Sequence, residues 1–258
     1  MRTFTLFVFL LGLISSAVAG QDEDALKRLN KAIEENPKDI AALSQRADLH
    51  EKLEKYEAAI ADWTRLLQLD KENAAAYQQR GCVRFKAGKV KESIADFDEY
   101  IQRKPSAKIS HWQRGISYYY AGQYENGRKQ FEGFQDFDKN DVENAVWRFM
   151  CMVRSDGIEK ARKAILPIGD DRRVPMRQVY DLYNGDLKPA DVMAAAKASR
   201  ELFYAHLYVG IYYDLLGEKK KAFEHIDQAT EKHRIGHYMW DVARVHRDLL
   251  AAELRNTK

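Results

Sequence analysis

The chain has 258 residues, of which 31% are charged and 45% are hydrophobic, and its formal net charge at pH 7 is +3. This balance is typical of a well-solvated helical protein and argues against nucleic acid or an anionic membrane as a partner. Five proline and fourteen glycine residues leave little room for a disordered linker.

Residues 1–19 have the three parts of a secretory signal peptide. Arg2 is their only basic residue, Phe4 to Ile14 form an apolar run, and Ala17-Val18-Ala19 gives a small-residue cleavage site. The run is too short to span a bilayer, which takes about 20 residues. We expect a chain that is exported, periplasmic or secreted, and soluble without stable membrane insertion once this segment is removed. Retention of the segment as an anchor is the alternative.

Residues 22–36 predict an amphipathic helix with no partner helix before it. Its apolar stripe consists of Ala25, Leu26, Leu29, Ala32 and Ile33. An uncovered stripe at the end of a helical array either serves as a cap or forms an oligomer contact. We therefore keep two expectations for residues 22–36, a terminal cap and a homodimer contact.

One pattern occurs three times between residues 40 and 139, at intervals of 34 residues. In each copy a small residue is followed 12 positions later by a second one, which gives the pairs Ala47 with Ala59, Gly81 with Ser93, and Gly115 with Gly127. Four positions further on stand the aromatic residues Trp63, Phe97 and Phe131. Because two helices approach closely only where side chains are tiny, each copy predicts a pair of antiparallel helices.

Other residues of the repeats predict turns, buried thiols and ion pairs. Gly88 and Gly122 stand between the two helices of their copies, where a positive φ can end the first helix. Cys82 and Cys151 fall on first helices two repeats apart, too far for a disulfide, so we expect two buried thiols. We also expect the inter-repeat ion pairs Arg80 with Asp62 and Arg114 with Asp96, worth about 1 kcal/mol or less each.

After Lys139 the pattern weakens. Residues 142–154 and 158–166 predict another helix pair, although Phe149 replaces the small residue of the first helix. Asp136-x-Asp138-x-Asn140 resembles the start of a calcium loop, but Asp141 and Trp147 stand where glycine and glutamate would be needed. We therefore interpret this segment as an inter-repeat turn with a helix cap.

The last third of the chain predicts an irregular helix pair, one more repeat and a final helix. Residues 174–183 and 189–198 form the irregular pair, and Gly210 with Ala222 restores the spacing within residues 201–232. Residues 238–254 predict an amphipathic helix that caps the end. We divide the chain into a signal peptide at 1–19, an array of a half repeat plus four repeats at 20–166, the irregular pair at 167–200, and the final repeat with its cap at 201–258.

The 34-residue period, the paired small residues and the following aromatic resemble the tetratricopeptide repeat (TPR) superfamily over residues 22–166 and 201–232. The resemblance implies an all-α protein, a right-handed α-solenoid of stacked helix pairs with a C-terminal capping helix. It also implies a concave surface that binds protein or peptide clients. The inner positions of the first helices include Ser44, Asp48, Gln78, Cys82, Trp112, Ile116, Tyr119, Tyr120, Val146 and Leu207.

The chemistry of these inner positions favours an apolar or extended client. TPR domains that grip a C-terminal carboxylate have lysine and asparagine where this chain has Ser44 and Asp48. A client segment lying on Trp112 and Tyr119 fits better, because aromatic side chains offer large, rigid contact surfaces. The alternative is that Trp112 packs between repeats.

Two stretches also resemble the NlpI family of bacterial envelope TPR lipoproteins. They are Val179-Tyr180-Asp181-Leu182-Tyr183-Asn184-Gly185 and the segment from Phe203 to Gly217. The resemblance implies a dimeric adaptor that brings a processing protease to cell-wall hydrolases. This chain lacks the lipidated cysteine of that family. A structural subunit of an envelope assembly complex is the alternative function.

The sequence offers no recognisable catalytic motif, so we expect a non-catalytic scaffold with no cofactor and no metal. Nucleophile-elbow, HExxH, P-loop and paired-cysteine zinc patterns do not occur. His225, His233, His237 and His246 gather near the C-terminus. His233 and His237 are spaced to share a helix face as metal ligands, but Ile235-Gly236 indicates a helix break between them. A surface and interface role is favoured for these residues.

Overall fold

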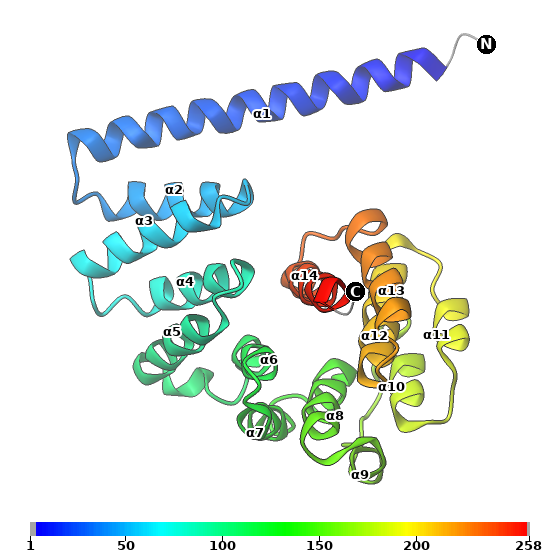
Figure 1. Ribbon diagram of the computed structural model, residues 1–258. Helices are drawn as coiled ribbons and strands as arrows, with labels where there is room; N and C mark the ends of the chain where they lie inside the picture. The colour runs from blue at the N-terminus through cyan, green and yellow to red at the C-terminus, as the bar shows by residue number, and fades with distance from the viewer. Residues whose placement is uncertain (1–3, 257–258) are drawn as a thin grey trace. The chain divides into compact units, whose positions relative to one another are not determined.

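The computed structural model describes the backbone of residues 4–256 and the side chains of residues 20–256. The predicted all-helical solenoid is confirmed (Figure 1). The helices are α1 Phe4–Glu35, α2 Ile40–Lys52, α3 Tyr56–Leu69, α4 Ala74–Lys86, α5 Val90–Arg103, the short 3-10 helix η1 Pro105–Ala107, α6 Trp112–Tyr120, α7 Tyr124–Phe134, α8 Val142–Asp156, α9 Ile158–Lys163, α10 Met176–Asn184, α11 Pro189–Ala195, α12 Ser199–Leu215, α13 Lys219–Lys232 and α14 Tyr238–Asn256.

The helices form two compact units. Unit 1 comprises the chain up to Ala87 together with Ala95–Arg103, and unit 2 comprises Gly88–Ile94 together with the chain from Lys104 onward. The domain boundaries proposed from the sequence remain predictions. The predicted signal peptide, residues 1–19, lies outside the residues whose side chains are described. Among the helices of the described residues, none is both long and apolar enough to cross a bilayer.

Unit 1 is built from stacked antiparallel helices around one apolar core. Ile33 of α1 packs there with Leu43, Ala47, Ala59 and Trp63, which are all 5% exposed or less. Leu29 and Ala32 of α1 pack against the same core. The half repeat predicted at residues 22–36 is therefore part of a longer helix, and part of its apolar stripe is covered by its own unit.

The close helix contacts predicted at small residues are confirmed. A Cβ atom added at Gly81 would lie 2.6 Å from a ring carbon of Phe97, and one added at Gly115 would lie 2.6 Å from Phe131. A Cβ at Gly210 would lie 3.2 Å from the backbone oxygen of Ala222. Because these distances are below ordinary van der Waals contact, only glycine fits where it faces the aromatic ring of the second helix.

The turns between paired helices also follow the prediction, with one exception. Gly88, Gly122 and Gly217 have φ values of 76°, 72° and 79°. Glu54 occupies the equivalent position between α2 and α3 and has a φ of 56°. A non-glycine residue in this region is strained, because its Cβ crowds the following carbonyl oxygen.

The expected inter-repeat ion pairs are wrong, because the arginines pair within their own repeats. Arg46 donates two hydrogen bonds to Asp62 at 2.8 and 2.6 Å, and Arg80 donates two to Asp96 at 2.9 and 2.7 Å. Arg114 donates to Gln130 at 3.0 and 2.7 Å. The partner stands sixteen residues after the arginine in each case, because the helix pair folds back and places those two positions side by side.

The same arginines also reach the preceding helix pair. Arg46 donates to Asn30 of α1 at 2.8 Å, and Arg80 donates to Thr64 of α3 at 3.1 Å. Arg148, one period after Arg114, donates to Glu132 of α7 at 3.1 and 2.8 Å and to the backbone oxygen of Ala164 at 2.5 Å. We call Arg46, Arg80, Arg114 and Arg148 the arginine series.

Unit 2 contains α6 to α14, and its last helix turns back onto its first. α14 packs beside α13, as a cap should, and also lies on the inner side of the helices α6, α8 and α12 (Figure 1). The Tyr120 hydroxyl of α6 lies 3.1 Å from Nδ1 of His246 of α14. Phe149, the residue that breaks the small-residue rule, is fully buried, and its ring meets that of Tyr183 of α10 at 5.4 Å.

Three smaller predictions are confirmed in the same region. The Asp141 carboxylate caps α8 by accepting a hydrogen bond from the Glu143 amide at 3.0 Å. Cys82 and Cys151 are buried thiols. Burial raises the pKa of the Cys151 thiol to about 12, so that this group stays protonated.

Candidate functional site

Several residues that were predicted to line the groove are buried in the core. Ile116, Tyr119, Cys82, Val146 and Leu207 are between 0 and 8% exposed, so their assignment to an open binding surface is wrong. Burial raises the pKa of Tyr119, whose hydroxyl accepts a hydrogen bond from Arg154 at 3.2 Å. Cys82 is buried within unit 1, whereas in unit 2 the Tyr119 ring packs against Tyr124 and Trp147 at 5.8 and 5.5 Å.

The remaining groove residues are at least partly accessible and lie in different units. Ser44, Asp48 and Gln78 belong to unit 1, where Ser44 and Gln78 are half-buried and Asp48 is exposed. Trp112 and Tyr120 belong to unit 2 and are half-buried. A role for any of these residues in binding remains a proposal.

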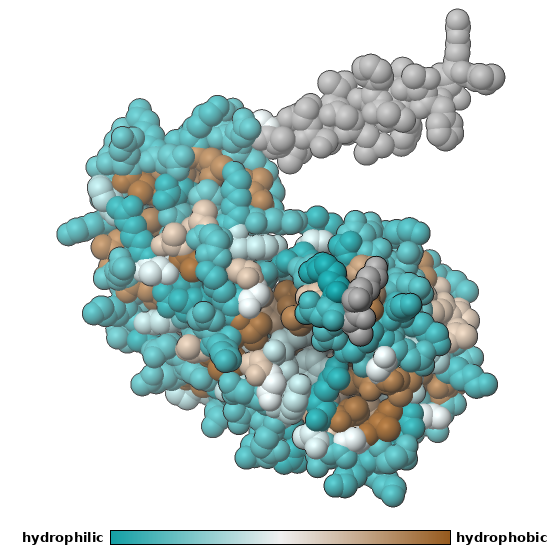
Figure 2. Space-filling model, in the orientation of Figure 1, coloured by the Kyte–Doolittle hydropathy of each residue, from teal (hydrophilic) through white to brown (hydrophobic). Residues whose placement is uncertain are grey.

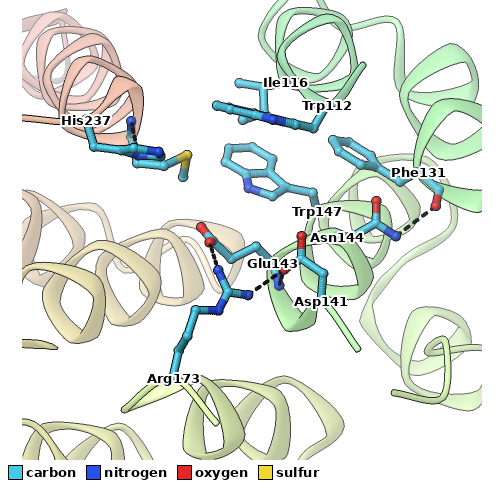
Figure 3. Close-up of a pocket in the computed structure, with 10 residues that line it drawn as sticks. Trp112, Ile116, Phe131, Asp141, Glu143, Asn144, Trp147, Arg173 and His237 are labelled. Atoms are coloured by element: carbon cyan, nitrogen blue, oxygen red, sulfur yellow. Dashed lines mark hydrogen bonds and ion pairs between the residues drawn. The ribbon is translucent and has the colours of Figure 1, made fainter. Parts of the chain in front are cut away.

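Trp112 opens a pocket within unit 2 that we call the α6/α8 pocket. It is partly open and has a volume of about 170 Å³. Its lining residues are Trp112, Ile116, Phe131, Asp141, Glu143, Asn144, Trp147, Arg173, His237 and Met239 (Figure 3).

Local helix starts position the aromatic part of the pocket. The Nδ1 atom of His111 accepts a hydrogen bond from the Arg114 amide at 3.2 Å, so α6 begins at Trp112. The Trp112 ring is stacked on His237 at 6.2 Å and meets Tyr238 edge-on at 5.3 Å. Trp147, one turn after Glu143 on α8, stacks with Phe131 at 6.3 Å.

The opposite part of the pocket carries charge, because Arg173 pairs there with Asp141 and Glu143 (Figure 3). Arg173 also pairs with Asp171, which does not line the pocket. Its guanidinium lies 2.6 Å from Asp141, 2.8 Å from Glu143 and 2.6 Å from Asp171. Tyr208 of α12 donates a hydrogen bond of 2.6 Å to Glu143. Burial, and then the charge of Asp141, raises the pKa of Glu143.

Two buried polar atoms of this pocket have no hydrogen-bond partner among the described residues. They are the Trp147 Nε1 donor and the Asn144 Oδ1 acceptor, on side chains of residues that are 2% and 3% exposed. The Asn144 amide nitrogen is satisfied, because it donates to the Phe131 backbone oxygen at 2.9 Å. Buried polar atoms normally find partners, so these two are unusual among the lining atoms.

Apart from Trp112 and Ile116, and from His237, for which a surface and interface role was expected, the lining residues of this pocket were missed as site residues by the sequence reasoning. Repeat spacing places Asn144 and Trp147 on a first helix, which was a usable signal. Arg173 comes from the connection between α9 and α10, and His237 from the turn before α14. No periodicity brings those two segments to α8.

His233 and His237 do not lie together as a pair of metal ligands. His233 follows α13 and its ring is stacked on His206 at 5.7 Å, whereas His237 precedes α14 and stacks on Trp112. The predicted helix break between them is confirmed. Within the part of the chain that the structure describes, no group of three or more histidine, cysteine or acidic side chains is arranged to hold a metal ion.

Antiparallel helix pairs with a 34-residue period, small residues at the crossing points and glycine turns define a TPR solenoid, and the chain has this fold. No protein-family model and no curated protein matches the sequence.

Solved structures with the same fold cover nearly the whole chain. A tetratricopeptide repeat protein from Parabacteroides merdae is 14% identical, with a TM-score of 0.58 over 92% of this chain and 95% of that one. PilW, described as a widely conserved type IV pilus biogenesis factor, is 15% identical, with a TM-score of 0.50 over 90% of this chain and 95% of that one. At these identities the similarity defines the fold alone.

Proposed function

We propose that the protein is a non-catalytic scaffold that binds segments of partner proteins, with the α6/α8 pocket as a contact point. One observation carries the proposal: unit 2 keeps a partly open pocket whose lining side chains include two buried polar atoms without a hydrogen-bond partner. A pocket with aromatic walls and a few placed polar groups suits a side chain of a peptide better than a reaction centre.

Site-specific photo-cross-linking tests this proposal on the full chain. A photoreactive residue at His237, which is exposed at the pocket, should capture partner proteins from envelope extract. The same residue at Lys160, exposed on α9, serves as the control. Capture at position 237 and not at 160 supports the proposal, whereas equal capture at both positions, or none at 237, overturns it.

The finer proposal concerns place and partners. We propose that the chain is exported and acts in the bacterial cell envelope, where it links a protease to cell-wall hydrolases as the NlpI-like resemblance implies. Cross-linking in cells separates this role from that of a structural subunit. Several weakly bound clients, including a protease, are expected of an adaptor, and one stoichiometric complex would contradict it. Recovery of the chain in the cytoplasmic fraction would contradict export.

A homodimer through residues 22–36 is part of the same proposal. Leu29, Ala32 and Ile33 already pack into unit 1, so the stripe left for a second copy centres on Ala25 and Leu26, which are half-buried. Changing Leu26 to lysine would place a charge in that contact. Sedimentation at tens of micromolar should show a dimer for the unchanged chain and a monomer for Leu26→Lys; a monomer in both cases refutes the dimer.

A further inference from the structure

The chemistry of the α6/α8 pocket specifies what kind of side chain it takes. Its aromatic walls are Trp112, Trp147 and Phe131, which Figure 3 draws on the side opposite the ion pairs of Arg173. The faces of indole rings are negative and attract cations. An aliphatic stem can lie against the same rings while its charged end reaches further.

The charged residues of the pocket also favour a cation, because acidic groups outnumber basic ones. Arg173 is the only lysine or arginine among the described lining residues, and it faces the carboxylates of Asp141, Glu143 and Asp171. Among the lining residues, two carboxyl groups, of Asp141 and Glu143, against one guanidinium leave an excess of one acidic group. The side chains of Asp141 and Glu143 are only 22% and 14% exposed, so water and salt screen this excess weakly.

The two unpartnered atoms complete the pattern. Asn144 Oδ1 is an acceptor without a donor, and an ammonium or guanidinium group supplies N–H donors. Trp147 Nε1 is a donor without an acceptor, and the backbone carbonyl oxygens of a bound peptide supply acceptors. A peptide that carries a cationic side chain therefore offers a partner to each atom.

We propose that the α6/α8 pocket binds the basic side chain of a lysine or arginine residue in an extended segment of a partner protein. The proposal rests on the scaffold function and names the chemistry that the scaffold recognises. Trp112 and Trp147 hold the aliphatic stem and the cation, Glu143 accepts its N–H donors, and Arg173 keeps the two lining carboxylates in place. The indole of Trp147 fixes the peptide backbone.

Titration of the full chain with blocked single residues tests this directly. The probes are N-acetyl-lysine methylamide, N-acetyl-arginine methylamide and N-acetyl-norleucine methylamide, the last being a neutral analogue of lysine. Binding is followed by NMR through the indole N–H resonances of Trp112 and Trp147. The two basic probes should bind about tenfold more tightly than norleucine, and their affinity should fall with added salt. Equal affinity for norleucine would overturn the proposal.

Variants locate the binding. Glu143→Gln keeps an acceptor for Tyr208 but removes the charge, and it should lower the affinity for the lysine probe about fivefold or more. The matched control is Glu159→Gln, an exposed residue of α9 outside the pocket. Trp112→Leu, checked for unchanged helix content, should lower the affinity for the basic probes more than for norleucine. An affinity for the lysine probe that is unaffected by both Glu143→Gln and Trp112→Leu overturns the proposal.

The experiments distinguish a failure of the cationic specificity from a failure of the scaffold function. If the basic probes do not bind but a photoreactive residue at position 237 still captures partners, the scaffold function stands and the cationic specificity is wrong. If neither occurs, both are wrong.

Discussion

The ion pairs of Arg46 and Arg80 contribute more to the free energy of unfolding than exposed ion pairs do, because their carboxylate partners are buried. The side chains of Asp62 and Asp96 are 6% and 3% exposed, and each accepts two hydrogen bonds from an arginine of the arginine series. Sequence reasoning assigned them the value of exposed pairs, about 1 kcal/mol or less. Removing one partner of a buried pair leaves an uncompensated charge, which costs several times more.

Changing Arg46 to methionine should therefore destabilise unit 1 by about 2 kcal/mol or more. Asp62 would keep only the His50 ring, at 4.0 Å. Methionine retains most of the aliphatic contact, so the loss reports on the ion pair. Urea unfolding measures the change, with Arg172→Met as the control, because the side chains of Arg172 and its partner Asp170 are both exposed. Equal losses in both variants would show that burial does not set the value of these pairs.

Gly115 sets the closest approach in the third repeat. Changing it to alanine would place a Cβ atom 2.6 Å from the Phe131 ring and should cost about 1 to 3 kcal/mol through overpacking. Gly133, on α7 of the same repeat, has nothing within 4 Å of an added Cβ. Gly133→Ala should be neutral or stabilise the helix by up to about 1 kcal/mol. Thermal unfolding compares the two, and a melting temperature unchanged by Gly115→Ala would contradict the packing described.

At the scale of helices, the turn between α2 and α3 differs from the other turns, because Glu54 stands where they have glycine. Changing Glu54 to glycine should relieve the left-handed strain between α2 and α3 and raise stability by about 0.5 to 1 kcal/mol. Gly88→Ala, at the equivalent turn, should lower stability by about 1 kcal/mol. Urea unfolding of the two variants gives the comparison. A loss of stability in Glu54→Gly would mean that the Glu54 side chain contributes more than its backbone costs.

The sequence predicts helices well here because their determinants are local. The pairs at Ala47, Gly81, Gly115 and Gly210 were placed by spacing alone, and α10 and α11 were predicted as a pair outside that spacing. The ion pairs were misassigned because spacing does not say which neighbouring helix an arginine faces. Exposure of Ile116 and Tyr119 was misjudged because repeat patterns carry no information about which inner positions become buried. The ion pair of Glu143 with Arg173 was not predicted, because Arg173 lies in a loop outside the repeats.

At the scale of the molecule, acid should destabilise unit 2 through its buried histidines. Burial lowers the pKa of His111 and of His246 to about 4, from an ordinary value of about 6.5. The unfolded chain then binds more protons than the native one, so this stability is complete above about pH 6.5 and is lost as the pH falls toward 4. The expected loss is on the order of 2 kcal/mol for each histidine. Urea unfolding at pH 7, 5.5 and 4 measures it.

His111→Asn provides the test of cause. Asparagine keeps an acceptor at the start of α6 and does not titrate in this range, so the variant should lose less stability between pH 7 and 4 than the unchanged chain. Identical pH profiles for the two proteins would remove His111 as a source of acid sensitivity.

The surface of the protein suits the proposed role, since most of the face drawn in Figure 2 is hydrophilic and apolar groups are confined to small areas. Such a surface disfavours non-specific association. Under the proposed function, specific recognition belongs to places such as the α6/α8 pocket, where aromatic and acidic groups meet.

The return of α14 onto α6 has a consequence for how this protein can evolve or be redesigned. An open solenoid lengthens by duplication, because each added repeat contacts only its neighbours. Here a duplicated helix pair inserted between α7 and α13 would carry His246 away from Tyr120, and His237 away from Trp112. The contacts of α14 with α6 therefore constrain the number of helix pairs between these two helices.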